Sequence, residues 1–351
     1  MKRIISQCRK ELVQFSRDRL TLALAFILPV MTLFIFGFAI RLEAKNIPVL
    51  VQDQDRTVFS QNYSDRLFAT NLFIPVVWEG NPETALDRGI ARAIVVIPPD
   101  FSRNLQANKT AEIQAIVDGT DANNARIIRN AIKATTRSFL QAENLISSTI
   151  PIETATRLWF NPGRQESLYI VPGVYAVVLW IFPSLLSAIA MVREKEKGTI
   201  LQVYASALTA EELILGKSLA YLIVGIGIAI GVMGLGSLIF QLNFAGDPMP
   251  LLLGTILYLW ASVMFGLMLG ARTSNQNSAV QGVSLVGFLT ALLLSGFIYP
   301  LSNIPFPLSL VSNIVPARYF IEITRDAFVW GVGWAGIGNN LVIIFLLGMV
   351  L

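Results

Sequence analysis

The residues that come closest to a nucleotide-binding motif are Gly216, Lys217 and Ser218. They match the end of a phosphate-binding P-loop, in which backbone N–H groups and a lysine hold the phosphates of ATP. The full motif requires a glycine five residues before Gly216, and that position is Glu211. An apolar run long enough to cross a membrane follows directly. The sequence therefore predicts that Lys217 lies at the lipid headgroups and that this chain binds no nucleotide.

Other catalytic chemistry has few groups available. The 351 residues include no histidine and one cysteine, Cys8. Histidine-based metal sites and histidine-activated nucleophiles are therefore excluded, and no disulfide can form within the chain. We expect no catalytic residues, no metal and no bound cofactor.

The segment 193–206 has features of a docking element. Its charged beginning can continue a helix as far as Lys197, and Gly198 can end that helix as a C-terminal cap. Thr209 to Glu212 reads as a capping box that opens the next helix. Between the two charged helix ends stand apolar side chains of a kind that fits a partner's groove, namely Ile200, Leu201, Val203 and Tyr204. From pattern alone, an ordinary solvated loop fits equally well.

The composition is that of a membrane protein: 54% of residues are hydrophobic and 14% are charged, with a mean hydropathy of +0.60, whereas soluble chains carry about 25% charged residues. A crossing helix needs about 20 apolar residues. Six runs without Asp, Glu, Lys or Arg are near that length: 20–40, 170–192, 218–240, 251–271, 278–299 and 334–351. Since coupled ion transport normally needs ionisable groups within the membrane, their absence disfavours proton-driven transport.

Basic residues indicate the orientation. Six Lys or Arg residues lie in 1–19 and four more in the loop 193–217, whereas 241–250 has none and 300–333 has two. Because short cytoplasmic segments are enriched in Lys and Arg, both termini are predicted to be cytoplasmic and 41–169 extracytoplasmic. The pI of about 9.2 then reflects topology, and no nucleic-acid partner is expected.

Two segments outside the spans have folds of their own. Residues 1–19 read as an interfacial helix on membrane lipid, with Ile5, Cys8, Leu12 and Phe15 on one side. In 41–169, strands are expected at 47–51, 72–78, 94–98 and 112–118, with helices at 57–69, 82–89 and 100–107 and a long helix from Asp121. The fold class is thus an all-α polytopic membrane domain (an interfacial helix, transmembrane helix 1 at 20–40, and helices 2–6 in 170–351) with an inserted extracytoplasmic α/β domain.

In this order, these features resemble the type 2 ABC-transporter permeases, the membrane subunits of bacterial ABC exporters. The resemblance rests on Glu194 to Thr199, on Glu212 to Lys217, and on the outer segment from Gly296 to Arg325. The α/β insert resembles that of a bacterial subgroup, through Ile97 to Ser102 and Val117 to Asn123.

The resemblance implies two sites. One is an ATPase-coupling loop with Glu194, Glu196, Gly198, Thr199, Ile200, Leu201 and Tyr204. The other is a partly re-entrant outer segment, 300–333, with Pro300, Pro305, Pro316, Arg318 and Arg325. It also implies a separate ATP-binding cassette ATPase as partner, which uses the ATP, and a second permease chain, identical or paralogous. The implied location is the bacterial inner membrane.

We therefore expect the permease subunit of an ATP-driven exporter of hydrophobic or amphipathic molecules, such as drugs or lipids. The alternative from another class is a membrane-anchored receptor or envelope scaffold that acts through its outer domain. Co-purification with an ATPase discriminates between them, because a receptor needs none.

Overall fold

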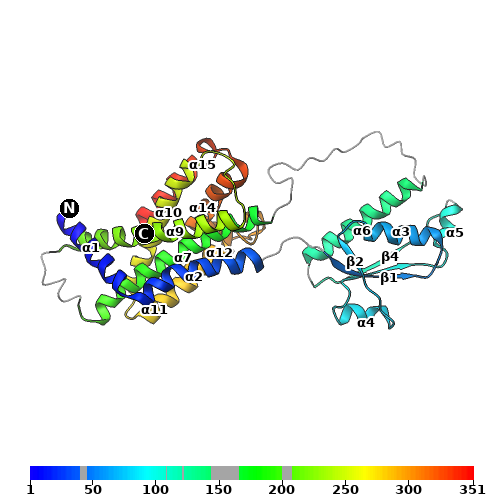
Figure 1. Cartoon of the computed structure of the whole chain (residues 1–351), viewed down its shortest axis with the longest axis horizontal. Coiled ribbons are helices and arrows are strands. Elements are labelled where there is room, and N and C mark those ends of the chain that lie inside the picture. The colour runs from blue at the N-terminus through cyan, green and yellow to red at the C-terminus, as the bar shows by residue number, and fades with distance from the viewer. Residues whose placement is uncertain (40–45, 108, 121, 144–165, 200–207) are drawn as a thin grey trace. The chain divides into compact units, whose positions relative to one another are not determined.

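The computed structural model describes residues 1–39, 46–107, 109–120, 122–143, 166–199 and 208–351 (Figure 1). The chain divides into two compact units. The first, called here the helical unit, comprises Met1–Ile40 and Arg157–Leu351, and the second, the sheet unit, comprises Arg41–Thr156.

The helical unit contains all the long apolar helices of the described residues. Four of them, α2, α7, α9 and α10, are long and apolar enough to cross a membrane, and the apolar α15 is shorter. The chain is thus a multi-pass membrane protein. Its elements are α1 (Lys2–Arg17), α2 (Arg19–Ala39), α7 (Ser167–Glu196), α9 (Ala210–Ile239), α10 (Met249–Arg272), α11 (Gln276–Gly282), the π-helical η1 (Val283–Phe288), α12 (Leu289–Leu293), the 3₁₀ turn η2 (Leu301–Asn303), α13 (Leu308–Ser312), α14 (Pro316–Arg325), the π-helical η3 (Asp326–Trp330) and α15 (Trp334–Val350).

Helix α7 is the central helix of this unit and contacts α2, α9, α10 and α14. Its contact with α10 is close because Gly266 has no side chain: a Cβ there would lie 2.1 Å from the carbonyl oxygen of Ser184. Hydroxyl groups also join the two helices, since Ser187 donates to the Val263 carbonyl at 3.0 Å and Ser262 donates to the Trp180 carbonyl at 2.6 Å. Small residues and hydroxyl groups at a helix interface are typical of membrane helices, which have little hydrophobic force between them.

The fifth and sixth predicted spans differ from the four long helices. The run 278–299 is helical only as far as Leu293, and a π-helical segment interrupts it. Gly296 then adopts φ +84°, a left-handed conformation that ends any regular helix. The sixth run is the 17-residue helix α15.

The sheet unit has a four-stranded sheet with helices between the strands. Strand order is β2-β1-β3-β4; β1 pairs in parallel with β2 and β3, while β4 is antiparallel to β3 at one edge. All four strands overlap the segments predicted as strands. The elements are β1 (Ile47–Asp53), α3 (Val58–Phe68), β2 (Phe73–Pro75), α4 (Pro82–Asp87), β3 (Ala93–Ile97), α5 (Phe101–Gln106), β4 (Gln114–Val117) and α6 (Ala122–Ala142).

Alternation along the two central strands supplies a core on each face of this sheet. On one face, Val49 and Val95 pack with Tyr63 of α3 and Phe139 of α6. On the other face, the next residues along the strands, such as Leu50 and Ile94, pack with Ala85 of α4. Figure 1 shows α3 and α6 on one side of the sheet and α4 on the other. Asp121, the predicted start of the long helix, lies outside the described residues.

Candidate functional site

The last turn of α7 carries three consecutive charged residues, and each contacts a different part of the helical unit. Glu194 faces α1 and α9, Lys195 reaches the C-terminal end of α10, and Glu196 reaches the N-terminal end of α11. We call these three residues the α7 terminus. Glu194 and Glu196 are the first two residues predicted for the ATPase-coupling loop.

Glu194 belongs to an ionic cluster with Glu11 of α1 and Lys217 of α9, which are buried, and with Lys10 of α1, whose side chain is 48% exposed. Lys217 Nζ lies 2.8 Å from Glu11 Oε1 and 3.3 Å from Glu194 Oε1, and it also donates to the Ala190 carbonyl at 3.3 Å. Lys10 Nζ lies 2.7 Å from Glu194 Oε1. Lys217, Glu11 and Glu194 are 0%, 3% and 5% exposed. Two carboxylates and two ammonium groups thus balance in formal charge.

Burial determines what this cluster can do. Taking charged groups out of water costs several kcal/mol per ion, so the charges of Glu11, Glu194 and Lys217 depend on their partners. Removing one partner of a buried pair typically costs about 3–5 kcal/mol, because the other charge stays buried without compensation. The cluster therefore holds α1, α7 and α9 in one arrangement.

Lys195 and Glu196 contact helix ends whose partial charges are opposite to their own. Lys195 donates to the carbonyl oxygens of Gly270 at 3.0 Å, Thr273 at 3.1 Å, and Ala271. These carbonyls belong to the end of α10, where the helix dipole favours a cation. Glu196 accepts a hydrogen bond from the Gln276 backbone N–H at 2.7 Å and another from its side chain, at the N-terminal end of α11, where an anion is favoured.

Arg193 adds a fourth connection. Its guanidinium lies 3.5 Å from Asp18, in the corner between α1 and α2. Asp18 accepts hydrogen bonds from the side chain of Thr21 at 2.6 Å and from its backbone N–H at 3.1 Å. These bonds, with a smaller contribution from Arg193, lower the pKa of Asp18 below its usual value. The carboxylate therefore stays charged at neutral pH and joins the first turn of α2 to the end of α7.

The predicted helix signals around the coupling loop are confirmed. α7 ends at Glu196, and Gly198 follows with φ +67°, the left-handed conformation of a glycine cap. The Thr199 hydroxyl donates to the Glu194 carbonyl at 3.3 Å. Thr209 and Glu212 form the predicted capping box at the start of α9. Ile200, Leu201 and Tyr204 lie outside the described residues.

The segment 300–333, predicted to lie on the outer side, contains short helices broken by prolines. Pro300 precedes η2, Pro305 lies between η2 and α13, and Pro316 is the first residue of α14, where its missing N–H leaves no helical bond unmade. The guanidinium of Arg318 contacts Asn313 and lies 5.6 Å from the ring centroid of Tyr319. Arg325 donates to the Gly296 carbonyl at 3.3 Å and lies 4.2 Å from the ring centroid of Tyr169.

The prediction for Lys217 was wrong. It was expected at the lipid headgroups, but its side chain is fully buried against two carboxylates. The burial of Glu11 was also missed, because apolar periodicity predicted a face of α1 formed by Ile5, Cys8, Leu12 and Phe15. In the structure Gln7 and Glu11 share that face, against α9, and Gln7 donates to Glu11 at 3.0 Å. The sequence did contain a signal for this ion pair, because Glu11 and Lys217 each stand among apolar residues of their helices.

Within the ranges that the structure describes, no group of three or more His, Cys, Asp or Glu side chains is arranged to hold a metal ion. The charged residues at the α7 terminus form ion pairs and helix-end contacts, which are arrangements for holding elements together.

Comparison with known proteins decides the family. Residues 19–351 match the family described as "ABC-2 family transporter protein". The chain belongs to the ABC-2 transporter family. It is similar to the Escherichia coli proteins named "Probable multidrug ABC transporter permease YbhS" (28% identical, 94% of this chain and 89% of the relative) and "Probable multidrug ABC transporter permease YbhR" (30% identical, 93% and 90%).

A more distant relative is "ABC transporter G family member 20" of Dictyostelium discoideum, which is 22% identical over 93% of this chain but only 46% of its own length. The similarity to bacterial permeases extends over nearly the whole of both chains. It identifies this ABC-2 protein as the permease subunit of an ABC exporter and not its ATPase.

Proposed function

We propose that this permease moves hydrophobic or amphipathic molecules out of a bacterial cell, powered by a separate ABC ATPase that docks on residues 199–206. The observation that carries this proposal is the α7 terminus. Glu194, Lys195 and Glu196 connect the residues next to the docking segment with α1, α9, α10 and α11. A movement of the ATPase applied there acts on four elements of the helical unit together.

The docking segment itself is proposed from its side chains. Ile200, Leu201 and Tyr204 are apolar residues between two helix ends that the structure defines, at Glu196 and Ala210. Burying such a side chain in a partner's groove contributes about 1.5–3 kcal/mol. An exposed ion pair contributes about 0–1 kcal/mol. The apolar residues should therefore contribute more to ATPase docking than the lysines beside them.

The test compares Leu201→Asp with a charge control in the reconstituted permease–ATPase complex. The control is Lys197→Ala and not Lys195→Ala, because Lys195 donates a hydrogen bond to the end of α10. Leu201→Asp should abolish substrate-stimulated ATP hydrolysis, whereas Lys197→Ala should retain most of it. Both variants must insert and purify normally. If Leu201→Asp assembles and couples as the unmodified permease does, the segment is a solvated connector and the docking proposal fails.

The topology is part of the proposal: six spans, both termini in the cytoplasm and 41–169 outside the bacterial inner membrane. The four long helices would be joined by the interrupted helix that begins at Gln276 and by α15. At 1.5 Å per residue α15 is about 25 Å long, near the lower limit for a crossing. The excess of Lys and Arg in 1–19 and 193–217 supports this orientation.

A cysteine at Asn62, an exposed position of α3, tests that orientation in a Cys8→Ser background. It should react with a membrane-impermeant maleimide added to intact spheroplasts. Labelling that requires membrane disruption would place the sheet unit in the cytoplasm and overturn the topology.

The oligomer and the substrate complete the proposal. A second permease chain, identical or paralogous, would pair with this one, and two ATPase subunits would supply the ATP. The word "multidrug" in the names of the bacterial relatives supports a drug-like or lipid-like substrate. So does the absence of ionisable side chains from all six apolar runs, because such spans offer no counter-ion to a charged solute.

A further inference from the structure

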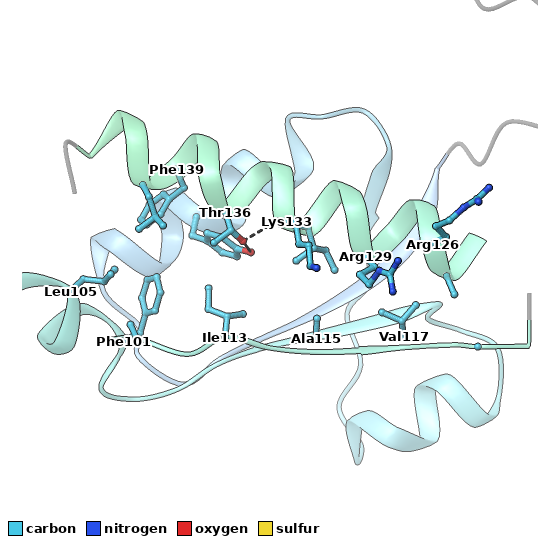
Figure 2. Close-up of a pocket in the computed structure, with 16 residues that line it drawn as sticks. Phe101, Leu105, Ile113, Ala115, Val117, Arg126, Arg129, Lys133, Thr136 and Phe139 are labelled. Carbon is cyan, nitrogen blue, oxygen red and sulfur yellow. Dashed lines mark hydrogen bonds between the residues drawn. The ribbon is translucent and has the colours of Figure 1, made fainter. Parts of the chain in front are cut away.

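The sheet unit contains a cavity of about 840 Å³ between α6 and β4. This volume lies within the range of roughly 300–1,000 Å³ that is typical of small-molecule sites. Small residues leave the space open: Ala115 of β4, Ala125 of α6 and Gly119 line it where larger side chains would fill it. Figure 2 shows α6 lying along β4, with side chains from both directed into the space between them.

The two ends of the cavity differ in chemistry. Phe101, Leu105 and Phe139 form an apolar end, with Ile113 beside them. Arg126 and Arg129 stand at the opposite end, near Val117 of β4 (Figure 2). These two ends are separated by 13 residues of α6, or about 20 Å along a helix. The cavity is therefore elongated, apolar at one end and basic at the other.

All three basic residues of the lining come from one face of α6. Arg126, Arg129 and Lys133 are spaced by three and four residues, which places them in a row on the helix surface. Among the described residues that line the cavity, none is Asp or Glu. Like charges one helical turn apart repel each other. An anion at this end of the cavity would relieve that repulsion and complement the basic row.

We propose that this cavity binds a single-chain amphipathic anion of the fatty-acid type. Its hydrocarbon chain would lie toward Phe101, Leu105 and Phe139, and its carboxylate or phosphate group would contact Arg129 and Lys133. Arginine and lysine bind such oxygen anions through charge-assisted hydrogen bonds, which are stronger than neutral ones. Binding here needs no ATPase and no transport, so it is tested independently of the proposed function.

The experiment measures protection of a cysteine placed on the cavity lining at Ala115, which is exposed to solvent in the absence of ligand. Ala115→Cys, in the full-length permease with Cys8→Ser, is reacted with a water-soluble maleimide in lipid nanodiscs. The rate is compared without ligand and with dodecanoate, dodecyl phosphate or dodecyltrimethylammonium, each below its micelle-forming concentration. Asn62→Cys, which lies outside the cavity lining, serves as the labelling control.

Dodecanoate or dodecyl phosphate should slow labelling of Ala115→Cys, and the one that protects at the lower concentration identifies the head group. The matched cation should have little effect, and Asn62→Cys should react at the same rate throughout. Arg129→Gln should raise the concentration of anion needed about tenfold, the effect expected for one hydrogen bond to a charged group. Arg137→Gln, which removes a charge from the same helix outside the cavity, should leave that concentration unchanged. Equal protection by the cation, or no protection by either anion, would overturn the proposal.

Discussion

Lys217 offers the sharpest test of the ionic cluster. In Lys217→Met the side chain keeps a similar length but loses its charge. Glu11 and Glu194, which are 3% and 5% exposed, would then share only Lys10. From the measured range for breaking buried pairs, we expect a loss of about 3–5 kcal/mol in the free energy of unfolding.

A surface pair in the same helices provides the control. Arg3 lies 3.6 Å from Glu212, with its side chain 56% exposed, and also joins α1 to α9. Exposed pairs of this kind contribute about 0–1 kcal/mol, so Arg3→Ala should change stability little. The assay is the fraction of monodisperse permease after heating in detergent, followed by fluorescence-detected size exclusion.

Glu11→Gln then tests whether the cost comes from unpaired charge. Because Glu11 accepts its hydrogen bond from Lys217 at 2.8 Å, the double variant Lys217→Met/Glu11→Gln buries one unpaired carboxylate fewer than Lys217→Met does. The double variant should therefore lose less than the sum of the two single losses, with a coupling of about 0.5–3 kcal/mol. If Lys217→Met is no less stable than Arg3→Ala, or if the two losses simply add, the cluster does not hold the three helices as argued.

Two further predictions concern packing and pH. Gly266→Leu should prevent close contact of α7 with α10 and greatly reduce the yield of folded permease, because even a Cβ there would lie 2.1 Å from the Ser184 carbonyl oxygen. Gly231→Leu is the control and should be tolerated, because a Cβ added at Gly231 would meet nothing within 4 Å. Equal yields of the two variants would refute this account of the interface. In the sheet unit, hydrogen bonds from the Thr120 backbone and side chain, together with Arg92, lower the pKa of Asp118 to about 2. Its contribution to stability is therefore present above the unfolded pKa of about 4 and is lost as the pH falls toward 2. Hydrogen-exchange protection of β3 and β4 should be weaker in Asp118→Asn than in the unmodified chain at pH 6, and the difference should shrink toward pH 2; a difference independent of pH would contradict this assignment.

Local signals in the sequence predicted much of the fold. The capping box at Thr209, the glycine cap at Gly198 and the short apolar runs that mark β1 and β3 each depend on a few neighbouring residues, and each is confirmed. Family resemblance led to the coupling loop, although its apolar residues lie outside the described part of the chain.

Long-range pairing could not be predicted in the same way. Glu11 and Lys217 are 206 residues apart, and no local pattern connects them. Lys217 stands at the start of an apolar run, where lysines commonly extend toward headgroups, and only the packing of α1 against α9 reverses that expectation. The cavity beside α6 was missed for a similar reason: its basic residues are exposed on the helix, and only the placement of β4 opposite α6 shows that they border a cavity.

The α7 terminus also limits where the permease can bend. The last turn of this helix contacts α1, α9, α10 and α11, so we expect this end of α7 to move together with those elements when a force is applied to the neighbouring segment. Flexibility has to come from further along α7, where Pro172 and Pro183 interrupt the backbone hydrogen-bond ladder. A force applied at the Glu196 end of α7 would then change the tilt of this end relative to the part of the helix beyond Pro183. We therefore expect charged contacts to hold the end of α7 in place and the two prolines to determine where the helix bends.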